Sequence, residues 1–310
     1  MDLSIVIPLF NEDESIGELI SWIDKVVSKM NIKYEVVMVD DGSTDNSWET
    51  LIALKQKFHF VKGLRFRRNY GKSAALNTGF KAIEGNVVIT MDADLQDSPE
   101  EIPHLYKMIK EEGYDLVSGW KRKRHDPLSK RLPSKLFNKT TRWLSGIELN
   151  DFNCGLKAYS KDVVKSIEVY GEMHRYIPVI AKNAGFAKIG EKVVEHQARK
   201  FGVTKFGLER VLRGYLDLIS ITFMTKFSKR PMHFFGAMGT LLSFIGIIML
   251  VYLSFMKLFF NIPGISDRPL FFLGMLSIII GVQLFIAGFL AEMISRNNPL
   301  RNEYSVKETI

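Results

Sequence analysis

The chain is poor in cysteine: its 310 residues include only Cys154, which excludes a disulfide within the chain. One cysteine agrees with a reducing compartment, and no spacing of His and Cys residues is typical of a zinc site. The pattern Gly-x-Gly-x-x-Gly is missing after the first apolar run, where the chain reads Pro8-Leu-Phe-Asn11-Glu12. A dinucleotide-binding fold and hydride transfer are therefore not expected. The N-terminus also lacks a basic stretch before its apolar run, so we expect no secretory signal peptide.

Acidic residues are scarce in one segment, and the net positive charge of the chain is concentrated there. The formal net charge is +8 at pH 7. Residues 121–142 contain nine lysines and arginines against one acidic residue, Asp126, so this segment accounts for the excess. A concentrated basic patch favours phosphate on a small substrate, a lipid headgroup or nucleic acid. Because the segment lacks a nucleic-acid-binding motif, we expect no nucleic acid partner.

Short apolar runs alternate with helical patterns through the first half of the chain, which is typical of an α/β domain with a mostly parallel sheet. The predicted strands are residues 4–7, 34–39, 61–66, 87–91 and 116–118. The predicted helices are residues 15–30, a helix ending near 58, 72–82 and a helix opening at Pro99. We expect Ser43 or Thr44 to cap the second helix and Asp97 to cap the helix near Pro99.

Polar residues follow three of these strands, as Asn11-Glu12, Asp40-Asp41 and Asp92/Asp94. Ligands of parallel sheets bind beyond the carboxyl ends of the strands, so we expect a site at this edge. If the chain stays extended after the fourth strand, side-chain alternation puts Asp92, Asp94 and Gln96 on one side. Their oxygen atoms suit a hard divalent cation that keeps positions open for substrate phosphates. A solvated strand-to-loop junction remains the plain alternative.

Two long runs near the C-terminus contain no charged residue: residues 234–256 and 270–291. Each can cross a hydrocarbon core, which needs about 20 residues. Basic residues flank the outer ends of the pair, so the positive-inside rule predicts that both termini are cytoplasmic. Residues 208–225 show an amphipathic helical pattern. We therefore predict a multi-pass protein of the inner (plasma) membrane with a cytoplasmic catalytic domain.

Three motifs in order carry a resemblance to a known family: Pro8-Leu-Phe-Asn11-Glu12, Asp40-Asp41-Gly42-Ser43-Thr44-Asp45 and Asp92-Ala93-Asp94-Leu95-Gln96-Asp97. Residues 1–206 resemble family 2 glycosyltransferases, and more closely the polyprenyl-phosphate glycosyltransferases, which include dolichyl-phosphate mannose synthase and bacterial undecaprenyl-phosphate glycosyltransferases. The two apolar runs resemble the bacterial branch. The resemblance implies a GT-A type domain over 1–206, an amphipathic juxtamembrane helix over 207–231, a transmembrane hairpin over 232–295 and a cytoplasmic tail over 296–310.

Site residues are carried over from the family position by position. The resemblance implies that nucleotide-sugar-binding residues are Pro8, Asn11, Glu12, Asp41, Asp92, Arg199 and Lys205. It implies that Asp92, Asp94 and Gln96 hold Mg²⁺ or Mn²⁺ against the donor diphosphate. Asp151 matches the proposed catalytic carboxylate, as a base or as an orienting group, and Asp94 is assigned to catalysis with it.

The acceptor phosphate is assigned to the basic segment. Lys121 stands where the family usually has arginine, so either Lys121 or Arg122 takes this role, and Arg131 matches a second family position. In the segment that contains Arg199 and Lys205, Thr204 replaces the serine of the family pattern Arg-x-x-Gly-x-Ser-Lys. The Gln-x-x-Arg-Trp pattern of processive polysaccharide synthases is missing there. His174 and His196 are interpreted as surface or core histidines.

Together these features indicate a membrane-anchored, metal-dependent, inverting glycosyltransferase. It would move a hexose or N-acetylhexosamine from a nucleotide sugar, UDP-linked in our interpretation, to undecaprenyl (polyprenyl) phosphate at the cytoplasmic leaflet. A transferase of the same fold acting on a glycolipid or protein, or a non-catalytic membrane partner, remain alternatives. The sugar, UDP against GDP, Mg²⁺ against Mn²⁺ and the oligomeric state, a homo-oligomer included, stay open.

Overall fold

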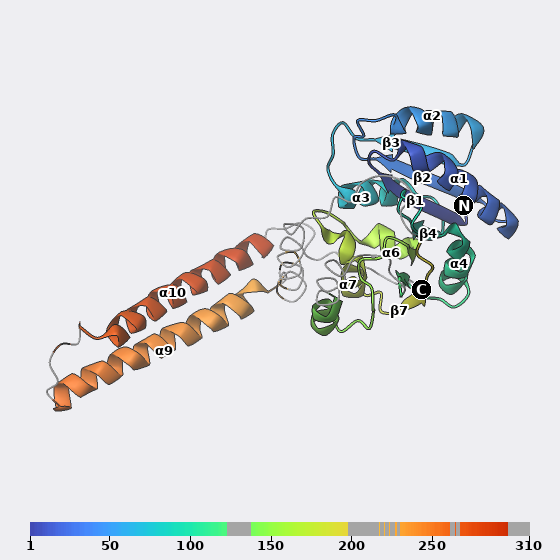
Figure 1. Cartoon of the computed structure of the whole chain (residues 1–310). Helices are drawn as coiled ribbons and strands as arrows, with labels where there is room; N and C mark the ends of the chain where they lie inside the picture. Colours follow the sequence, from blue (N-terminus) through green and yellow to red (C-terminus); the bar gives the residue numbers. More distant parts are fainter. Residues whose placement is uncertain are drawn as a thin grey trace. The chain divides into compact units, whose positions relative to one another are not determined.

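The computed structural model describes residues 1–122, 138–197, 230–260 and 267–296, with positions 217, 220, 223, 227 and 264. The chain divides into two compact units, Met1–Ile221 and Thr222–Ile310. Figure 1 shows an α/β arrangement in the first unit and a pair of long helices in the second. The amphipathic helix expected over 208–225 lies almost entirely outside the described residues.

Among the described residues, a seven-stranded sheet forms the centre of the N-terminal unit. Its strands are β1 (Leu3–Leu9), β2 (Tyr34–Asp40), β3 (Val61–Arg65), β4 (Val87–Thr90), β5 (Leu116–Trp120), β6 (Lys157–Ser160) and β7 (Ile189–Val193). The strand order is β3-β2-β1-β4-β6-β5-β7. All neighbouring pairs are parallel except those of β6, which runs antiparallel to β4 and β5. The carboxyl ends of the other strands therefore lie at one edge.

Helices cover both faces of this sheet (Figure 1). One face packs against α1 (Asp13–Val27), α2 (Ser47–Lys57) and α4 (Ile102–Lys110). The other packs against α3 (Lys72–Ala82), α6 (Lys161–Ser166) and α7 (Ile177–Asn183). Alternate residues of β1 divide between the two cores: Ile5 and Ile7 join the first and Val6 the second. Because both faces are buried, β1, β2 and β4 read as continuous apolar runs.

The five strands predicted from the sequence are confirmed within a few residues, and the helix predicted over 72–82 is confirmed at both ends. The predicted caps are wrong. The second helix begins at Ser47 and its preceding residue makes no side-chain cap, while the Ser43 hydroxyl accepts the Asn11 N–H at 3.0 Å. The turn that opens at Pro99 is capped by Ser98, whose hydroxyl accepts the Glu100 N–H at 3.3 Å.

The second unit contains two long apolar helices, α9 (Pro231–Phe260) and α10 (Pro269–Arg296). Both helices are long enough and apolar enough to cross a membrane, with mean hydropathies of 2.2 and 2.5. Thirty residues of α-helix extend about 45 Å, which exceeds the ~30 Å of a hydrocarbon core. The runs predicted over 234–256 and 270–291 fall within these two helices.

Glycines allow α9 and α10 to approach closely. A Cβ atom on Gly239 would lie 2.5 Å from the carbonyl oxygen of Gly281, and one on Gly246 would lie 2.6 Å from that of Gly274. Small residues at helix contacts are typical of membrane hairpins, since lipid supplies little hydrophobic force between the helices. Glycine at these positions therefore allows the two backbones to meet.

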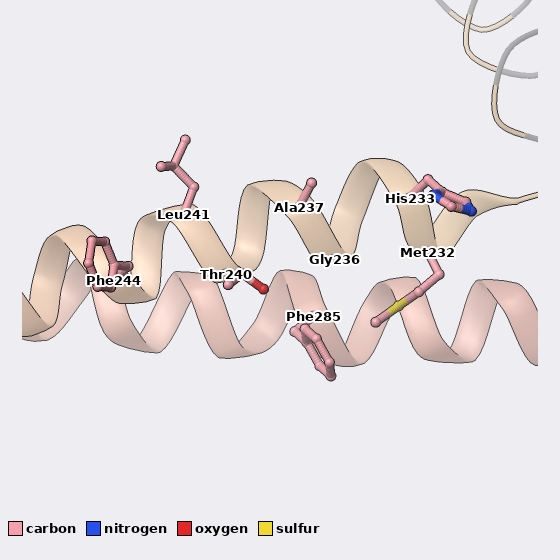
Figure 2. A pocket seen from close by; sticks show the side chains of 8 residues that line it. All are labelled: Met232, His233, Gly236, Ala237, Thr240, Leu241, Phe244 and Phe285. Atoms are coloured by element: carbon pink, nitrogen blue, oxygen red, sulfur yellow. The ribbon is translucent and has the colours of Figure 1, made fainter.

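A groove runs along the first half of α9, with a cavity volume of about 580 Å³. Figure 2 shows its lining, which comes from α9 except for Phe285 of α10. The lining is apolar apart from His233 and Thr240. The groove thus presents the kind of surface expected of a helix that faces lipid.

Candidate active site

The segments after β1 and β2 are joined at the carboxyl edge of the sheet. Asn11 adopts a left-handed conformation with φ 57°. Its N–H donates to the Ser43 hydroxyl at 3.0 Å, and its side-chain oxygen accepts the Thr44 N–H at 2.9 Å. Asparagine tolerates this backbone region better than most residues. Asn11 therefore fixes the shape of the loop that was predicted to surround the nucleotide.

Pro8 and Glu12 stand on either side of this loop. Pro8 pairs with Val39 of β2 and lies beyond the last paired positions of β1 and β4. Its missing N–H therefore costs no hydrogen bond on the β4 side. Glu12 precedes α1, and its N–H donates to the Ser47 hydroxyl at 2.9 Å, which ties the first helix to the second.

Asp41 holds the turn that precedes α3. Its buried carboxylate accepts the N–H groups of Tyr70, at 2.7 Å, and of Gly71, at 2.9 Å. Burial raises the pKa of Asp41, although these hydrogen bonds act in the opposite direction. The next residue, Gly42, has φ +73°, and a Cβ atom there would lie 2.5 Å from the backbone carbon of Arg68. Only glycine allows these two loops to meet so closely.

The segment from Asp92 to Asp97 is a turn, so the prediction that it stays extended is wrong. Pairing of β4 with both neighbours ends at Thr90, which removes the constraint that would keep the chain extended. Leu95 then takes a left-handed conformation with φ 59°. The Gln96 N–H donates to an Asp94 carboxylate oxygen at 3.2 Å. The turn, and not strand alternation, sets the arrangement of these carboxylates.

Asp92 forms an ion pair with Lys72, the first residue of α3. The two side chains are 31% and 28% exposed. Burial acts to raise the pKa of Asp92, but the Lys72 and Lys121 ammonium groups outweigh it and hold the pKa well below its usual range. A Cβ atom on Gly155 would lie 2.6 Å from the Asp92 carboxyl carbon. Asp92 thus lies beside a cation and a glycine backbone and remains partly exposed.

Asp97, the last residue of the same turn, is completely buried. The Lys121 ammonium, on a side chain only 14% exposed, lies 2.6 Å from its carboxylate. Burial raises the pKa of Asp97, and the pKa of Lys121 is raised by Asp97 although burial opposes this. The neighbouring Arg122 is exposed, and its guanidinium lies 5.8 Å from the centre of the Trp120 ring. Of the two candidates for the acceptor phosphate, Arg122 faces solvent and Lys121 is committed to Asp97.

Asp151 is buried and is held by residues of β5 and β7. Its N–H donates to the Glu191 carboxylate at 3.0 Å, and its carbonyl accepts the Ser118 hydroxyl at 3.1 Å. One carboxylate oxygen accepts the Asn153 N–H at 3.1 Å. Strand residues on both sides therefore fix the backbone of the predicted catalytic carboxylate.

Cys154 and Lys157 lie in the same buried region. Burial raises the pKa of the Cys154 thiol to about 12. The Lys157 ammonium donates to the Cys154 carbonyl, and burial lowers the pKa of this lysine. The charges of both Asp151 and Asp92 act on Lys157. A third lysine, with Lys72 and Lys121, thus balances the acidic groups of the site.

The remaining predicted residues divide into two groups. Arg131, Arg199 and Lys205 lie outside the described residues. His174 and His196 are described: the Nδ1 atom of His174 lies 3.0 Å from the Ser73 hydroxyl, and that of His196 lies 3.3 Å from the Gln96 carbonyl.

Three charged residues of the site were not predicted: Lys72, Lys157 and Glu191. A signal existed for Lys72, which follows Gly71 after the third strand, and for Lys157, a charge between Leu156 and Ala158. For Glu191 the sequence carries no comparable signal.

The Asp92–Asp97 turn has the chemistry to hold a divalent cation. Within the described residues no three His, Cys, Asp or Glu side chains form a metal-binding group. Mg²⁺ is, however, often bound by one or two carboxylates, with substrate phosphates and water completing its shell. The Lys72 ammonium already stands as a cation on Asp92. The Asp92 carboxylate therefore suits Mg²⁺ or Mn²⁺, and the oxygen donors of Asp94 and Gln96 follow in the same turn.

Residues 4–167 match the model of a family described as Glycosyl transferase family 2. Over 303 residues the chain is 36% identical to a dodecaprenyl-phosphate galacturonate synthase of Rhizobium johnstonii, a match that covers 96% of this chain and 88% of that protein. It is also 36% identical over 296 residues to an undecaprenyl-phosphate 4-deoxy-4-formamido-L-arabinose transferase of Shewanella sediminis, covering 95% and 87%. Both matches extend through the C-terminal helices.

Solved structures share the fold at lower sequence identity. Glucosyl-3-phosphoglycerate synthase from Mycobacterium tuberculosis, in complex with phosphoglyceric acid, has a TM-score of 0.55 at 19% identity, over 72% of this chain and 79% of that chain. The same enzyme in complex with Mn²⁺, UDP-glucose and glycerol 3-phosphate has a TM-score of 0.54 at 20% identity, with the same coverage. These structures identify the described sheet as a GT-A-like fold.

Proposed function

Because the chain belongs to glycosyl transferase family 2, we propose that it transfers a sugar from a nucleotide sugar to polyprenyl phosphate with inversion at the anomeric carbon. The observation that carries this proposal is the Asp92–Asp97 turn after β4, whose carboxylates pair with Lys72 of α3 and with Lys121 after β5. Such a cluster suits a metal-bound diphosphate. The polyprenyl acceptor rests on the names of the relatives in Rhizobium johnstonii and Shewanella sediminis.

The donor is proposed to be UDP-linked and to bind across the ends of β1, β2 and β4. Pro8, Asn11, Glu12 and Asp41 would surround the base and ribose. The buried Asp41 carboxylate keeps lone pairs for a base N–H in addition to its two backbone contacts. Arg199 and Lys205, which are not among the described residues, are proposed to contact the diphosphate.

A divalent cation held by Asp92, Asp94 and Gln96 would neutralise the charge that develops on the departing nucleoside diphosphate. In the displacement, a phosphate oxygen of the acceptor attacks the anomeric carbon on the face opposite the diphosphate, and the bond to the diphosphate breaks. An acceptor phosphate is largely ionised near neutral pH, since its second pKa is about 6. Asp151 is therefore proposed to orient the acceptor and to balance the lysines around it.

The acceptor phosphate is proposed to meet Arg122 and Arg131. Arg122 faces solvent and can offer the planar, two-pronged contact that suits phosphate. Lys121 is better assigned to the interior, because it pairs with buried Asp97. We propose that α9 and α10 anchor the enzyme in the inner (plasma) membrane with both termini cytoplasmic, so that a membrane-confined acceptor reaches the site at high effective concentration.

The test is to incubate membranes containing the protein with polyprenyl phosphate and a panel of nucleotide sugars, and to determine the mass of the lipid product. Because two relatives are named for galacturonate and formamido-arabinose transfer, uronic acid and amino-pentose donors belong in the panel beside hexose and N-acetylhexosamine donors. We expect a sugar-phosphoprenol product with one donor. The Asp94→Asn variant in matched membranes serves as the control.

Other outcomes separate the alternatives. A glycosylated glycolipid or protein, without a sugar-phosphoprenol, would show a transferase with another acceptor. No transfer from any donor to any acceptor would support a non-catalytic membrane partner.

A further inference from the structure

Lys72 carries a positive charge at the position where the proposed metal must bind. Its ammonium contacts one carboxylate oxygen of Asp92, and both side chains remain partly exposed. The sequence motifs assigned no role to this lysine. A cation on Asp92 and a second cation at the same carboxylate cannot both be accommodated without strong repulsion. The structure therefore describes Asp92 in a state that opposes metal binding.

The backbone of Lys72 is held firmly, whereas its side chain is long. Asp41 accepts the N–H groups of the two preceding residues, Tyr70 and Gly71. Gly71 has φ +94°, so the chain enters α3 through a turn that favours glycine. A lysine ammonium on its four-carbon stem can leave Asp92 by rotation about side-chain bonds alone. No movement of α3 is needed for the exchange.

An ammonium that leaves Asp92 while a divalent cation binds there is left beside a like charge. This arrangement becomes favourable when an anion arrives with the metal, and the diphosphate of the donor is such an anion. Asp92 would then bind the metal while Lys72 faces the new negative charge. The metal alone is repelled by the Lys72 ammonium, and the diphosphate alone is repelled by the Asp92 carboxylate. When both are bound, each ligand offsets the charge that repels the other.

We propose that Lys72 is a positioning residue that suppresses metal binding to the empty enzyme and makes the divalent cation and the nucleoside diphosphate bind cooperatively. The proposal rests on the function proposed above and adds an order to it: the metal binds tightly only with the donor diphosphate. By linkage, the factor by which UDP raises Mn²⁺ affinity equals the factor by which Mn²⁺ raises UDP affinity.

The test measures Mn²⁺ binding to the full chain in detergent by titration calorimetry, first without nucleotide and then with saturating UDP. Lys72→Met should bind Mn²⁺ alone about tenfold more tightly than the wild type, because a unit charge next to the divalent ion is removed. UDP should raise the Mn²⁺ affinity of the wild type by at least about tenfold and that of Lys72→Met by much less. These readouts do not require turnover.

Two variants control the experiment. Lys72→Arg keeps the positive charge and should retain weak Mn²⁺ binding to the empty enzyme. Lys81→Met removes an exposed lysine near the other end of α3 and should behave as the wild type. Thermal unfolding of all three variants shows whether each is folded before binding is compared.

The outcomes separate the two proposals. If Lys72→Met binds Mn²⁺ alone no more tightly than the wild type, or if neither protein binds Mn²⁺, the role of Lys72 is overturned. If the product assay detects no sugar transfer while Lys72→Met gains Mn²⁺ affinity, the metal-binding role stands and the proposed function fails.

Discussion

The active-site edge and the helical hairpin achieve close contact by opposite means. At the active-site edge, carboxylates and lysines pair in partly or fully buried positions, as Asp92 does with Lys72 and Asp97 with Lys121. In the hairpin, backbones touch because Gly239, Gly246, Gly274 and Gly281 carry no side chain. Removing a side chain should therefore damage the first region, and adding one should damage the second.

Asp94→Asn is expected to give the largest effect. It keeps the size of the side chain and removes a charge from the proposed cation site, so transfer should fall by at least about 1,000-fold. Folding and membrane insertion should be unchanged. The measurement is sugar transfer in membranes, beside Glu14→Gln on exposed surface as control. Wild-type turnover in this variant, or in excess chelator, would remove the metal role.

The pair of Lys121→Ala and Arg122→Ala sharpens the difference between a buried and an exposed cation. Lys121→Ala leaves the Asp97 carboxylate buried without its partner, which should cost about 3–5 kcal/mol of unfolding free energy. Arg122→Ala should leave stability unchanged and raise the KM for polyprenyl phosphate more than that for the donor. Thermal unfolding and steady-state kinetics measure the two effects. Equal unfolding temperatures in both variants would contradict the assignment.

Gly155→Ala tests whether the rule for the hairpin also applies inside the charged site. The added Cβ atom would press on the Asp92 carboxyl carbon, 2.6 Å away. Displacement of this carboxylate should lower transfer by about 10- to 100-fold, since small errors of position in an active site have effects of this size. Gly17→Ala, where no atom lies within 4 Å, is the control and should retain full activity. Full activity in Gly155→Ala would show that Asp92 can move without cost.

Within the hairpin, Gly239→Ala and Gly236→Ala form a matched pair. A Cβ atom at 239 meets the backbone of α10, whereas the nearest atoms to one at 236 belong to the flexible Met232 side chain of its own helix, the first at 3.0 Å. Both changes gain the same helix propensity, so their difference reports packing. Gly239→Ala should be less stable by about 1–3 kcal/mol, measured by thermal unfolding in detergent. Equal stability would contradict close backbone contact.

The last expected effect depends on pH and concerns the buried Glu35. Burial acts to raise its pKa, but the Lys62 ammonium, the Ser4 hydroxyl and the Glu84 N–H outweigh this and lower it. The stabilisation is therefore complete above the ordinary pKa of 4.5 and is lost as the pH falls through the lower pKa of the folded state.

Glu35→Gln should accordingly lower the unfolding temperature at pH 7, by an amount equivalent to about 1–3 kcal/mol. The difference from the wild type should shrink below about pH 4.5. The exposed Glu111→Gln is the control. A difference that stays constant from pH 7 to pH 4 would show that the carboxylate charge is not the cause.

Local patterns predicted much of the fold because the first strands are buried on both faces and each is followed by a helix. The alternation of an apolar strand with a helical pattern was therefore clear for β1, β2 and β4. It failed for β6, a four-residue strand that reverses direction between β4 and β5 and contains Lys157. A short strand with a buried charge has no periodic signal, and its direction depends on partners far away in the sequence.

The candidate site was predictable in its residue types but not in its pairings. Asp40 and Asp41 are adjacent, yet Asp40 accepts the Ser43 N–H and pairs with Arg65, while Asp41 holds the turn before α3. Extended geometry failed at Asp92–Gln96 because Leu95 adopts a left-handed backbone. Lys121 could be assigned to phosphate from charge alone, and only its distance to Asp97 shows that it lies inside.

The buried Cys154 can serve as a built-in probe of local opening in this protein. Burial raises the pKa of its thiol to about 12 and leaves the residue only 2% exposed. The thiol should therefore resist alkylation at neutral pH as long as this region stays folded. As it is the single cysteine of the chain, any labelling measures one event. The rate of that labelling reads out how often the region between Asp151 and Lys157 opens, in unmodified protein and without a fluorescent probe.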